Sequence, residues 1–304
     1  RNNRELTKNL YEIIKHMPKR SHPMDVARTA VSVMGLEDKE TTDSSPEANM
    51  RKALRIFAKT PTALAAFYRI RKGKKIIKPK KNLTFAENFF YMCFGKVPQK
   101  EIVKAFDVSL ILYAEHSFNV STFTARTITS SLSDIHGAIT GAIASLKGPL
   151  HGGANEEVMH MMNKIKKPEN ALKWINNALK NKEVVMGFGH RVYKSGDSRV
   201  PTMRKYFGKV AKLKKDKKFE KIYDIVEKVM IKEKNIHPNV DYPTGPTYHL
   251  MGFDTDFFTP IFVISRITGW SAHIMEQHAA NKLIRPLASY KGNKHRKVMQ
   301  LNQR

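Results

Sequence analysis

The spacing of apolar residues limits what this chain can fold into, because it is helical along almost the whole sequence. Residues 100–116 and 219–230 place apolar side chains three and four positions apart, as one face of a helix requires. Ser45 and Pro46 open a further stretch, residues 46–58, with a capping residue and a proline in the first turn. Alternating strand patterns bounded by hairpin turns are scarce. The sequence therefore predicts an all-α fold.

Length and composition indicate a globular protein with an inserted domain. The chain has 304 residues, of which 41% are apolar, enough for a large core in one big domain or two smaller ones. Composition shifts near Asn155 and Asp254, and the stretch between them is lysine-rich and punctuated by glycine and proline. We expect a large helical domain formed by residues 1–154 and 255–304, with a smaller helical domain, residues 155–254, inserted into it.

Cysteine usage and the first residues bear on the cellular compartment. The single cysteine, Cys93, lies in an apolar run and is interpreted as a core residue, because no partner histidine stands in the local pattern. One cysteine cannot form an internal disulfide, which fits a reducing compartment. Residues 1–20 are basic and helix-spaced like a transit peptide, but Glu5 and Glu12 argue against one. No apolar run approaches the roughly 18 residues of a membrane span. We expect a cytoplasmic protein with no membrane partner.

The net charge is strongly positive, +27 from 54 basic and 27 acidic residues. Clustered lysines and arginines are typical of nucleic-acid binding, but also of a solvated surface around a site for anionic small molecules. The lysines fall mostly in surface-like runs at 72–81, 164–167 and 212–221, and no helix-turn-helix, zinc-finger or aromatic RNA-binding signature accompanies them. We therefore favour an anionic small molecule over nucleic acid; a basic nucleic-acid-binding protein is the alternative from another class.

Two histidines and one aspartate stand beside glycine or proline breaks. His151 lies in the segment GPLHGG, His190 in GFGH and Asp241 in PNVD. Such turns are where a scaffold displays reactive groups. Together the three residues offer a base and two hydrogen-bond donors, the set needed to remove a proton from carbon and stabilise the resulting enolate.

Arg266 is the most unusual single residue, because it lies in a strongly apolar stretch at 259–270. A guanidinium cannot be neutralised by losing a proton, so its burial demands an anion. That anion is either a carboxylate of the protein core or a substrate carboxylate bound bidentately, and the sequence leaves both open. Taken alone, Arg199 and Arg285 are typical of surface charges and His116 of a helix end.

A metal site is the alternative for one spacing. Glu157 and His160 form a Glu-x-x-His pair with His151 close upstream, and di-metal helical bundles use two such pairs. The sequence contains no second pair and no His-Glu-x-x-His motif. We expect Glu157 and His160 on a helix surface, and no metal ligands in this chain.

The chain resembles the citrate synthase family, which includes the 2-methylcitrate synthases. The resemblance lies in the segments around His151, His190 and Asp241, in NVDYPTG at 239–245, and in FTPIF and SRITGW between residues 258 and 270. These motifs occur in the family's order, from about His22 to the C-terminus. Family members begin with a further N-terminal segment, so the resemblance implies that this sequence starts within the large domain.

The resemblance also implies a role for each matching residue. The catalytic triad would be His151, His190 and Asp241. The dicarboxylate would be bound by His116, Arg199, Arg266 and Arg285, the last reaching into the neighbouring subunit's site. Backbone groups of one loop would contact coenzyme A: Val184, Val185, Met186, Gly187 and Phe188. The family fold is all-α, with a large and a small domain that close over substrate. Its basic unit is a homodimer, and it needs no metal or tightly bound cofactor.

The implied reaction suits these residue types. Asp241 is the expected base, neutral His151 the donor to the thioester oxygen, and His190 the donor to the carbonyl oxygen of oxaloacetate. The predicted function is condensation of acetyl-CoA with oxaloacetate, followed by hydrolysis of citryl-CoA to citrate and CoA. The alternative is a 2-methylcitrate synthase that uses propionyl-CoA, or dual specificity, because one methylene changes binding by only about 1–3 kcal/mol.

Overall fold

The computed structural model describes residues 1–190, 192–193, 195–293 and 296–304. Within these ranges every regular element is a helix, apart from an isolated β-bridge between Phe188 and Pro238. The predicted all-α fold is confirmed. The elements, in chain order, are α1 (Lys8–His16), α2 (Pro23–Glu37), α3 (Pro46–Arg71), α4 (Phe85–Phe94), α5 (Lys100–Tyr113), α6 (Val120–Ser130), α7 (Ile135–Leu146), α8 (Ala154–Ile165), α9 (Pro168–Lys180), α10 (Val200–Lys214), α11 (Lys218–Lys234), α12 (Asp241–Met251), η1 (Thr255–Phe257), α13 (Phe258–Ala279) and η2 (Leu301–Gln303).

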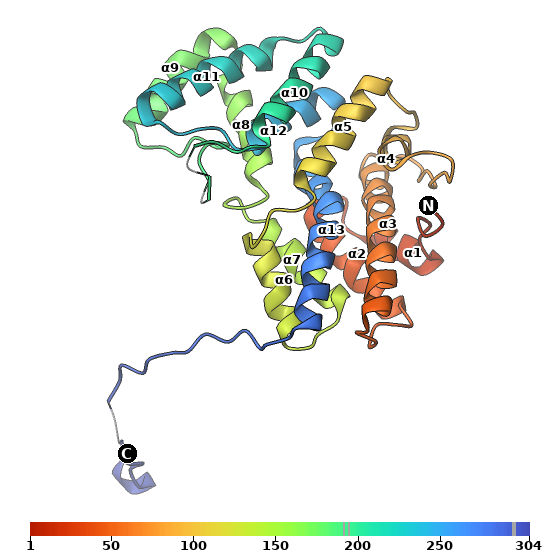
Figure 1. Ribbon diagram of the computed structural model, residues 1–304, viewed down its shortest axis with the longest axis vertical. Coiled ribbons are helices and arrows are strands. Elements are labelled where there is room, and N and C mark those ends of the chain that lie inside the picture. Colours follow the sequence, from red (N-terminus) through yellow and green to blue (C-terminus); the bar gives the residue numbers. More distant parts are fainter. Residues whose placement is uncertain (191, 194, 294–295) are drawn as a thin grey trace.

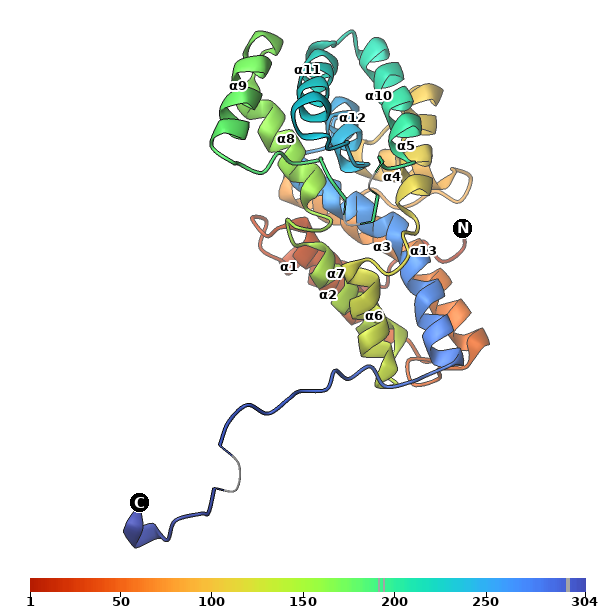
Figure 2. The same ribbon diagram turned by 60° about the vertical axis from the view of Figure 1, so that its left-hand side comes forward.

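Helix α13 is the axis of the larger part of the molecule. It packs against α3, α5, α6 and α7, and Figures 1 and 2 both show it running between them. Its buried residues cover nearly all of its circumference from Phe258 to Ile274, as expected of a helix that is apolar all round. Arg266 and Trp270 lie on this buried helix and are 1% and 0% exposed. The centre of the protein therefore contains a guanidinium group.

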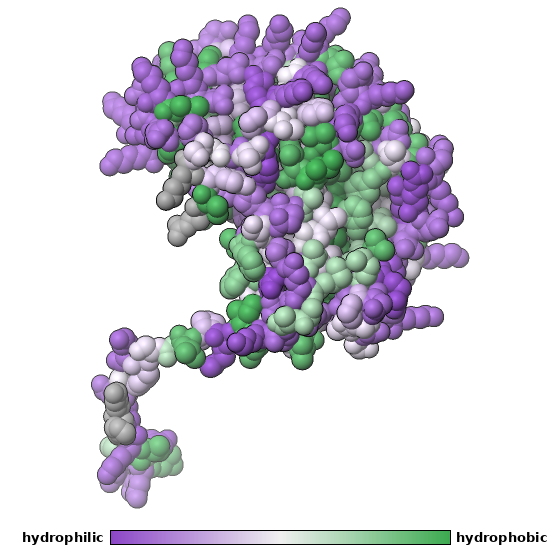
Figure 3. All heavy atoms as spheres, viewed as in Figure 1, coloured by the Kyte–Doolittle hydropathy of each residue, from purple (hydrophilic) through white to green (hydrophobic). Residues whose placement is uncertain are grey.

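Helices α8 to α12 gather at one end of the molecule (Figures 1 and 2). There α10 packs on α12, α11 on α9, and α12 on α8, while α5 contacts both α10 and α12. Hydrophilic side chains cover the outer side of this end (Figure 3). The helices correspond closely in sequence to the predicted inserted domain, residues 155–254, but the division into two domains stays a prediction.

Two predicted helices have different ends in the structure. The helix predicted over 46–58 continues to Arg71 through Pro61, because the residues beyond this proline, including Leu64 and Phe67, are buried against the rest of the core. The helix predicted over 100–116 ends at Tyr113. Its last carbonyls turn to α13 instead, where Tyr113 O accepts from Arg266 Nε and Ala114 O accepts from the Gly269 N–H. The helix predicted over 219–230 is confirmed as α11.

The last part of the chain leaves the helical body. After α13, Asn281 and Ile284 still hydrogen-bond to Ser130 at the end of α6. Beyond them the chain runs away from the packed helices (Figures 1 and 2). Arg285 lies on this exposed segment.

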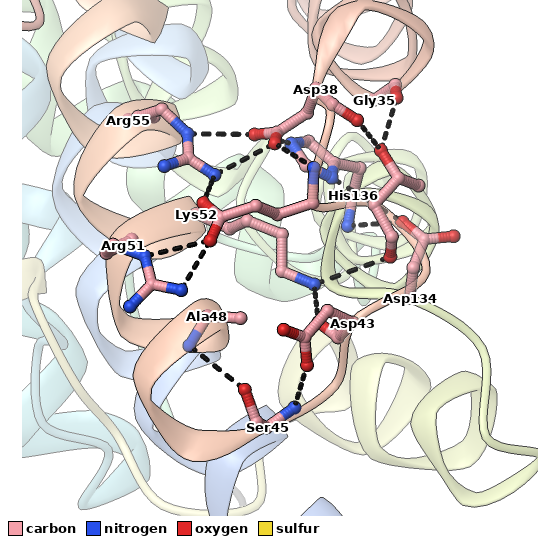
Figure 4. Close-up of polar contacts among 12 residues, drawn as sticks. Gly35, Asp38, Asp43, Ser45, Ala48, Arg51, Lys52, Arg55, Asp134 and His136 are labelled. Atoms are coloured by element: carbon pink, nitrogen blue, oxygen red, sulfur yellow. Dashed lines mark hydrogen bonds and ion pairs between the residues drawn. The ribbon is translucent and has the colours of Figure 1, made fainter.

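A polar cluster away from the centre holds the loop between α2 and α3 (Figure 4). Lys52 is fully buried, and its Nζ donates to the carbonyl oxygens of Thr41 and Asp43. Arg55 donates to both carboxylate oxygens of Asp38 at 2.8 and 2.9 Å. Because these cations are satisfied by loop oxygens, the cluster is best explained as structural.

The start of α7 joins the same cluster through its N-cap. Asp134 accepts hydrogen bonds from the backbone N–H groups of His136 and Gly137 at 2.8 and 3.0 Å. The buried His136 ring lies between Asp134 and Asp38, 3.6 Å from each (Figure 4). The His136 side chain and these two amides hold the pKa of the Asp134 carboxyl down to about 2.

We expect Asp134→Ala to lower the free energy of unfolding by about 1–2 kcal/mol, because it removes a helix cap. Asp134→Asn keeps a capping oxygen and is the matched control, with a smaller expected loss. Urea unfolding checks both. Since folding lowers this pKa from 3.8 to about 2, the charge stabilises the fold above pH 4, and that contribution is lost as the pH falls towards 2. Equal stability of all three proteins would contradict the capping role.

Candidate active site

Two distant loops run side by side and bring His190 to the start of α12. The Gly189 N–H donates to His237 O at 2.9 Å, and the Asn239 N–H donates to Gly187 O at 2.8 Å. Gly187 has a φ of +84°, and a Cβ there would lie 2.7 Å from Val158. Only glycine fits this backbone, so the GFGH pattern is needed to form the loop.

Asp241 is the first residue of α12 and faces the interior of the site. The Tyr113 hydroxyl donates to its Oδ1 at 2.5 Å. The residue keeps some accessible surface, but protein surrounds the carboxyl closely enough that burial raises its pKa to about 6. At neutral pH the group is therefore mainly ionised, yet a stronger base than an ordinary aspartate.

His151 is held by the first turn of α6. Its Nε2 accepts a hydrogen bond from the Ser121 N–H at 3.2 Å and lies 2.8 Å from the Ser121 hydroxyl. Trp270 Nε1 donates to the same hydroxyl at 3.1 Å, which fixes this serine. Because Nε2 accepts from a backbone amide, the ring proton is assigned to Nδ1. Burial, with the nearby charge of Arg266, lowers the pKa of His151 to about 4, so the ring is neutral at pH 7 and can donate from Nδ1.

The rings of His190 and His116 lie edge to face with centroids 4.9 Å apart. His190 Nδ1 accepts from the backbone N–H groups of Val192 and Tyr193, at 3.1 and 3.3 Å, which assigns its proton to Nε2. Burial and then Arg199 lower the pKa of both histidines, that of His116 to about 4. His116 Nε2 lies 3.0 Å from the Tyr193 hydroxyl. These rings are suited to donate hydrogen bonds as neutral imidazoles.

Arg266 has binding capacity that the protein leaves unused. Its Nε donates to Tyr113 O at 2.7 Å, while its buried Nη1 has no hydrogen-bond partner among the described residues. The guanidinium lies 4.6 Å from the Phe262 ring centroid, and in the described part of the chain it forms no ion pair with a carboxylate. Burial and then Arg199 lower its pKa only to about 10, so it stays charged. A structural salt bridge therefore does not explain this arginine, and a bound anion would.

Arg199, the residue immediately before α10, is the second arginine near Asp241. It donates to both carboxylate oxygens of Asp197, at 2.9 and 2.7 Å. Asp197 also accepts from the Val240 N–H at 3.0 Å, which ties this ion pair to the residue before Asp241. The charges of Arg199 and Arg266 both lower the pKa of Asp241, against the larger effect of its burial. A cavity of about 270 Å³, lined by His190, Asp197 and residues 235–238 among others, opens beside this group.

The structure thus gathers six predicted residues around one place: His116, His151, His190, Arg199, Asp241 and Arg266. A slightly larger cavity of about 290 Å³ lies beside Asp38 and Arg55 and contains none of them. We assign the candidate site to the place where the six residues meet, because among the described residues it combines a base of raised pKa, neutral hydrogen-bond donors and an unpaired guanidinium.

Similarity to known proteins decides the family. The protein-family model described as "Citrate synthase, C-terminal domain" matches residues 1–287 of this chain. The chain belongs to the citrate synthase family. A citrate synthase of Mycolicibacterium smegmatis is 51% identical over 98% of this chain and 80% of its own length. A 2-methylcitrate synthase of Mycobacterium tuberculosis is also 51% identical, over 97% of this chain and 75% of its own.

Solved structures of the citrate synthase family have the same fold. The citrate synthase of Thermoplasma acidophilum, solved as a ternary complex with carboxymethyl coenzyme A and oxaloacetate, superposes with a TM-score of 0.90 at 32% identity. The match covers 99% of this chain and 81% of that one. The family predicted from the turn motifs is therefore confirmed.

Two groups of residues that the citrate synthase resemblance assigned lie outside the gathered six. Arg285 is exposed on the segment after α13, and in the described part of the chain no hydrogen bond or ion pair joins it to the six residues. Residues 184–188 form the stretch leading to His190, with Val184 79% exposed and Val185 buried. Contact of this stretch with coenzyme A stays a prediction.

The remaining predictions concern groups away from the site. Cys93 is buried in the core, as predicted. His160 is exposed on α8 and Glu157 partly so. In the described part of the chain no three His, Cys, Asp or Glu side chains are grouped to hold a metal ion. Among the described helices, none has the length and hydrophobicity needed to cross a membrane.

Sequence reasoning missed three residues that shape the site: Tyr113, Ser121 and Asp197. Tyr113 lies on the apolar face of its predicted helix, and this position gives no indication of a role for its hydroxyl. Ser121 gave no signal beyond its closeness to His116. Asp197 stands two residues before Arg199, a spacing that allows an ion pair, and this was the one usable signal.

Proposed function

We propose that this protein condenses acetyl-CoA with oxaloacetate and hydrolyses the resulting citryl-CoA to citrate and free CoA. The observation that supports this most is that Asp241, whose pKa is raised to about 6, and the buried guanidinium of Arg266 lie at the same place. A base and an anion site at one place are what a carbon acid and a keto diacid need.

Each proposed step uses a group whose protonation state follows from its surroundings. Asp241 removes a proton from the α-carbon of the acyl group. The Nδ1–H of neutral His151 donates to the developing enolate oxygen. The enolate carbon attacks the keto carbon of oxaloacetate, whose oxygen accepts a hydrogen bond from His190 and takes a proton from it. His190 regains a proton and Asp241 releases the one it removed, so both residues return to their starting states. Water then adds to the thioester carbonyl: its oxygen stays in the new carboxylate of citrate, one of its protons goes to the CoA thiol and the other to solvent.

The carboxylates of oxaloacetate would take up the unused donors. Arg266 offers its buried Nη1, and His116 offers a neutral ring beside His190. Arg199 is already bidentate to Asp197 and would contribute mainly through its charge. The wider basic surface favours the approach of anionic oxaloacetate and of phosphate-bearing CoA.

A 2-methylcitrate synthase, using propionyl-CoA, is the second candidate, because close relatives carry both names at equal identity. Thiol release, measured with acetyl-CoA and with propionyl-CoA in the presence and absence of oxaloacetate, tests the proposal. We expect release that depends on oxaloacetate, with a higher kcat/KM for acetyl-CoA. A higher value for propionyl-CoA would favour the second candidate, and no oxaloacetate-dependent release would contradict both.

The assembly is also a proposal: a homodimer in which the partner's Arg285 completes the site. It is supported by the apolar residues exposed on and before α6, Phe118, Val120 and Phe123, which are 51–63% exposed in one chain. Sedimentation equilibrium would measure the mass. Arg285→Ala should then weaken oxaloacetate binding in a dimer that still forms. A monomer with full activity would contradict this assembly.

We also propose that the two predicted domains move relative to each other when substrate binds. Residues 155–254 would move against the rest of the chain and close the site around bound substrate, which excludes water until condensation is complete. Small-angle scattering with and without oxaloacetate and a CoA analogue would detect the closure as a smaller radius of gyration. No change on binding would contradict it.

A further inference from the structure

Tyr113 contacts two of the charged groups of the candidate site, Asp241 and Arg266. Its hydroxyl donates to Asp241 Oδ1 at 2.5 Å, and its backbone carbonyl accepts from Arg266 Nε at 2.7 Å. One residue at the end of α5 therefore links the proposed base on α12 to the proposed anion-binding arginine on α13.

The tyrosine has little freedom to move. It is 1% exposed, and its ring centroid lies 4.0 Å from that of Phe262. The chain just after it is fixed by the Gly269 N–H, which donates to Ala114 O at 3.1 Å. This approach requires a glycine, because a Cβ on residue 269 would lie 2.5 Å from Ala114 O. The hydroxyl position is thus set by the packing of α5 on α13.

The direction of the hydrogen bond follows from the surroundings. Burial and the charge of Asp241 raise the pKa of Tyr113 well above its usual value, so the hydroxyl keeps its proton and is the donor. Asp241 Oδ1 is occupied by this bond. Its Oδ2 has no hydrogen-bond partner in the described part of the chain and is free to take up a proton.

We propose that Tyr113 is a positioning residue that holds the Asp241 carboxylate with Oδ1 bound and Oδ2 directed at the substrate. The inference rests on the proposed function in one respect, that Asp241 acts as the base. A donor fixed before substrate binds also favours the ionised carboxylate, which is the form that can remove a proton.

The test is Tyr113→Phe, which deletes the hydroxyl and retains the ring and the carbonyl. We expect kcat to fall about tenfold at neutral pH, and the acid limb of the kcat profile to move up by roughly one pH unit. The KM for oxaloacetate should change little, since the carbonyl still accepts from Arg266. Tyr248→Phe is the matched control, because Tyr248 is equally buried but donates to Ser109. We expect it to retain the parent profile.

A measurement without turnover separates this inference from the proposed function. Carboxyl ¹³C NMR titration, with Asp241→Asn to assign the signal, reports the pKa of Asp241 directly. We expect that pKa to be higher in Tyr113→Phe than in the parent. An inactive parent with this shift would contradict the proposed function alone. An unchanged pKa, or a kcat and pH profile equal to those of Tyr248→Phe, would overturn the positioning role.

Discussion

Asp241→Asn is expected to lower kcat by at least about 10²-fold, the usual effect of losing a general base. The amide has nearly the same shape as the carboxylate, and its oxygen can still accept from the Tyr113 hydroxyl. The fold should therefore persist, but the amide cannot take a proton from carbon. Steady-state thiol release measures the loss, and circular dichroism and calorimetric binding of oxaloacetate check that the variant is folded and still binds.

The control for this variant is an aspartate with no place in the site. Asp224 is 59% exposed and pairs with Arg204 at 2.7 Å, so Asp224→Asn should turn over like the parent. In the parent, kcat/KM should fall as the pH drops through about 6, because the base becomes protonated there. If Asp241→Asn retained parent turnover, Asp241 would not be the base.

Arg266→Leu is expected to weaken oxaloacetate binding by roughly tenfold to a hundredfold, the range for a lost hydrogen bond to a charged group. The buried Nη1 has no hydrogen-bond partner among the residues that the structure describes. The loss should therefore fall on binding of the dicarboxylate, and the KM for acyl-CoA should change much less. Calorimetric titration with oxaloacetate alone, together with both KM values, measures the difference.

A second arginine serves as the control. Arg204 also lies partly buried against an aromatic ring, but it is paired with Glu220 and Asp224. Arg204→Leu should leave the KM values for oxaloacetate and acyl-CoA unchanged while lowering the Tm. Equal losses for oxaloacetate and acyl-CoA in Arg266→Leu, accompanied by a lower Tm, would indicate that Arg266 has a structural role only.

Helical spacing and turn residues predicted most of the fold and the residues at the centre of the candidate site. Apolar residues at helical spacing predicted the helices that became α5 and α11, and the breaks around His151, His190 and Asp241 predicted where side chains would be displayed. The sequence did not predict where some helices end. The proline at position 61 stays inside α3 because burial of the residues after it outweighs a lost backbone bond.

The sequence could not predict which side chains contact the site residues, because these contacts join residues that are far apart in the chain. Tyr113 and Asp241 are separated by 128 positions, and Ser121 and His151 by 30. Such contacts arise only when α5, α6, α12 and α13 pack together. A tyrosine on an apolar helix face gives the same sequence signal whether its hydroxyl meets a catalytic carboxylate or a backbone carbonyl, as that of Tyr242 does.

The most direct test of the proposed chemistry is to follow the new carbon–carbon bond. The purified protein is incubated with oxaloacetate and acetyl-CoA labelled with ¹³C at the methyl carbon, and the products are read by ¹³C NMR. The proposed function predicts that the label appears in a methylene group of citrate, with one free CoA thiol per citrate. Label recovered only as acetate, or only as unreacted thioester, would contradict it.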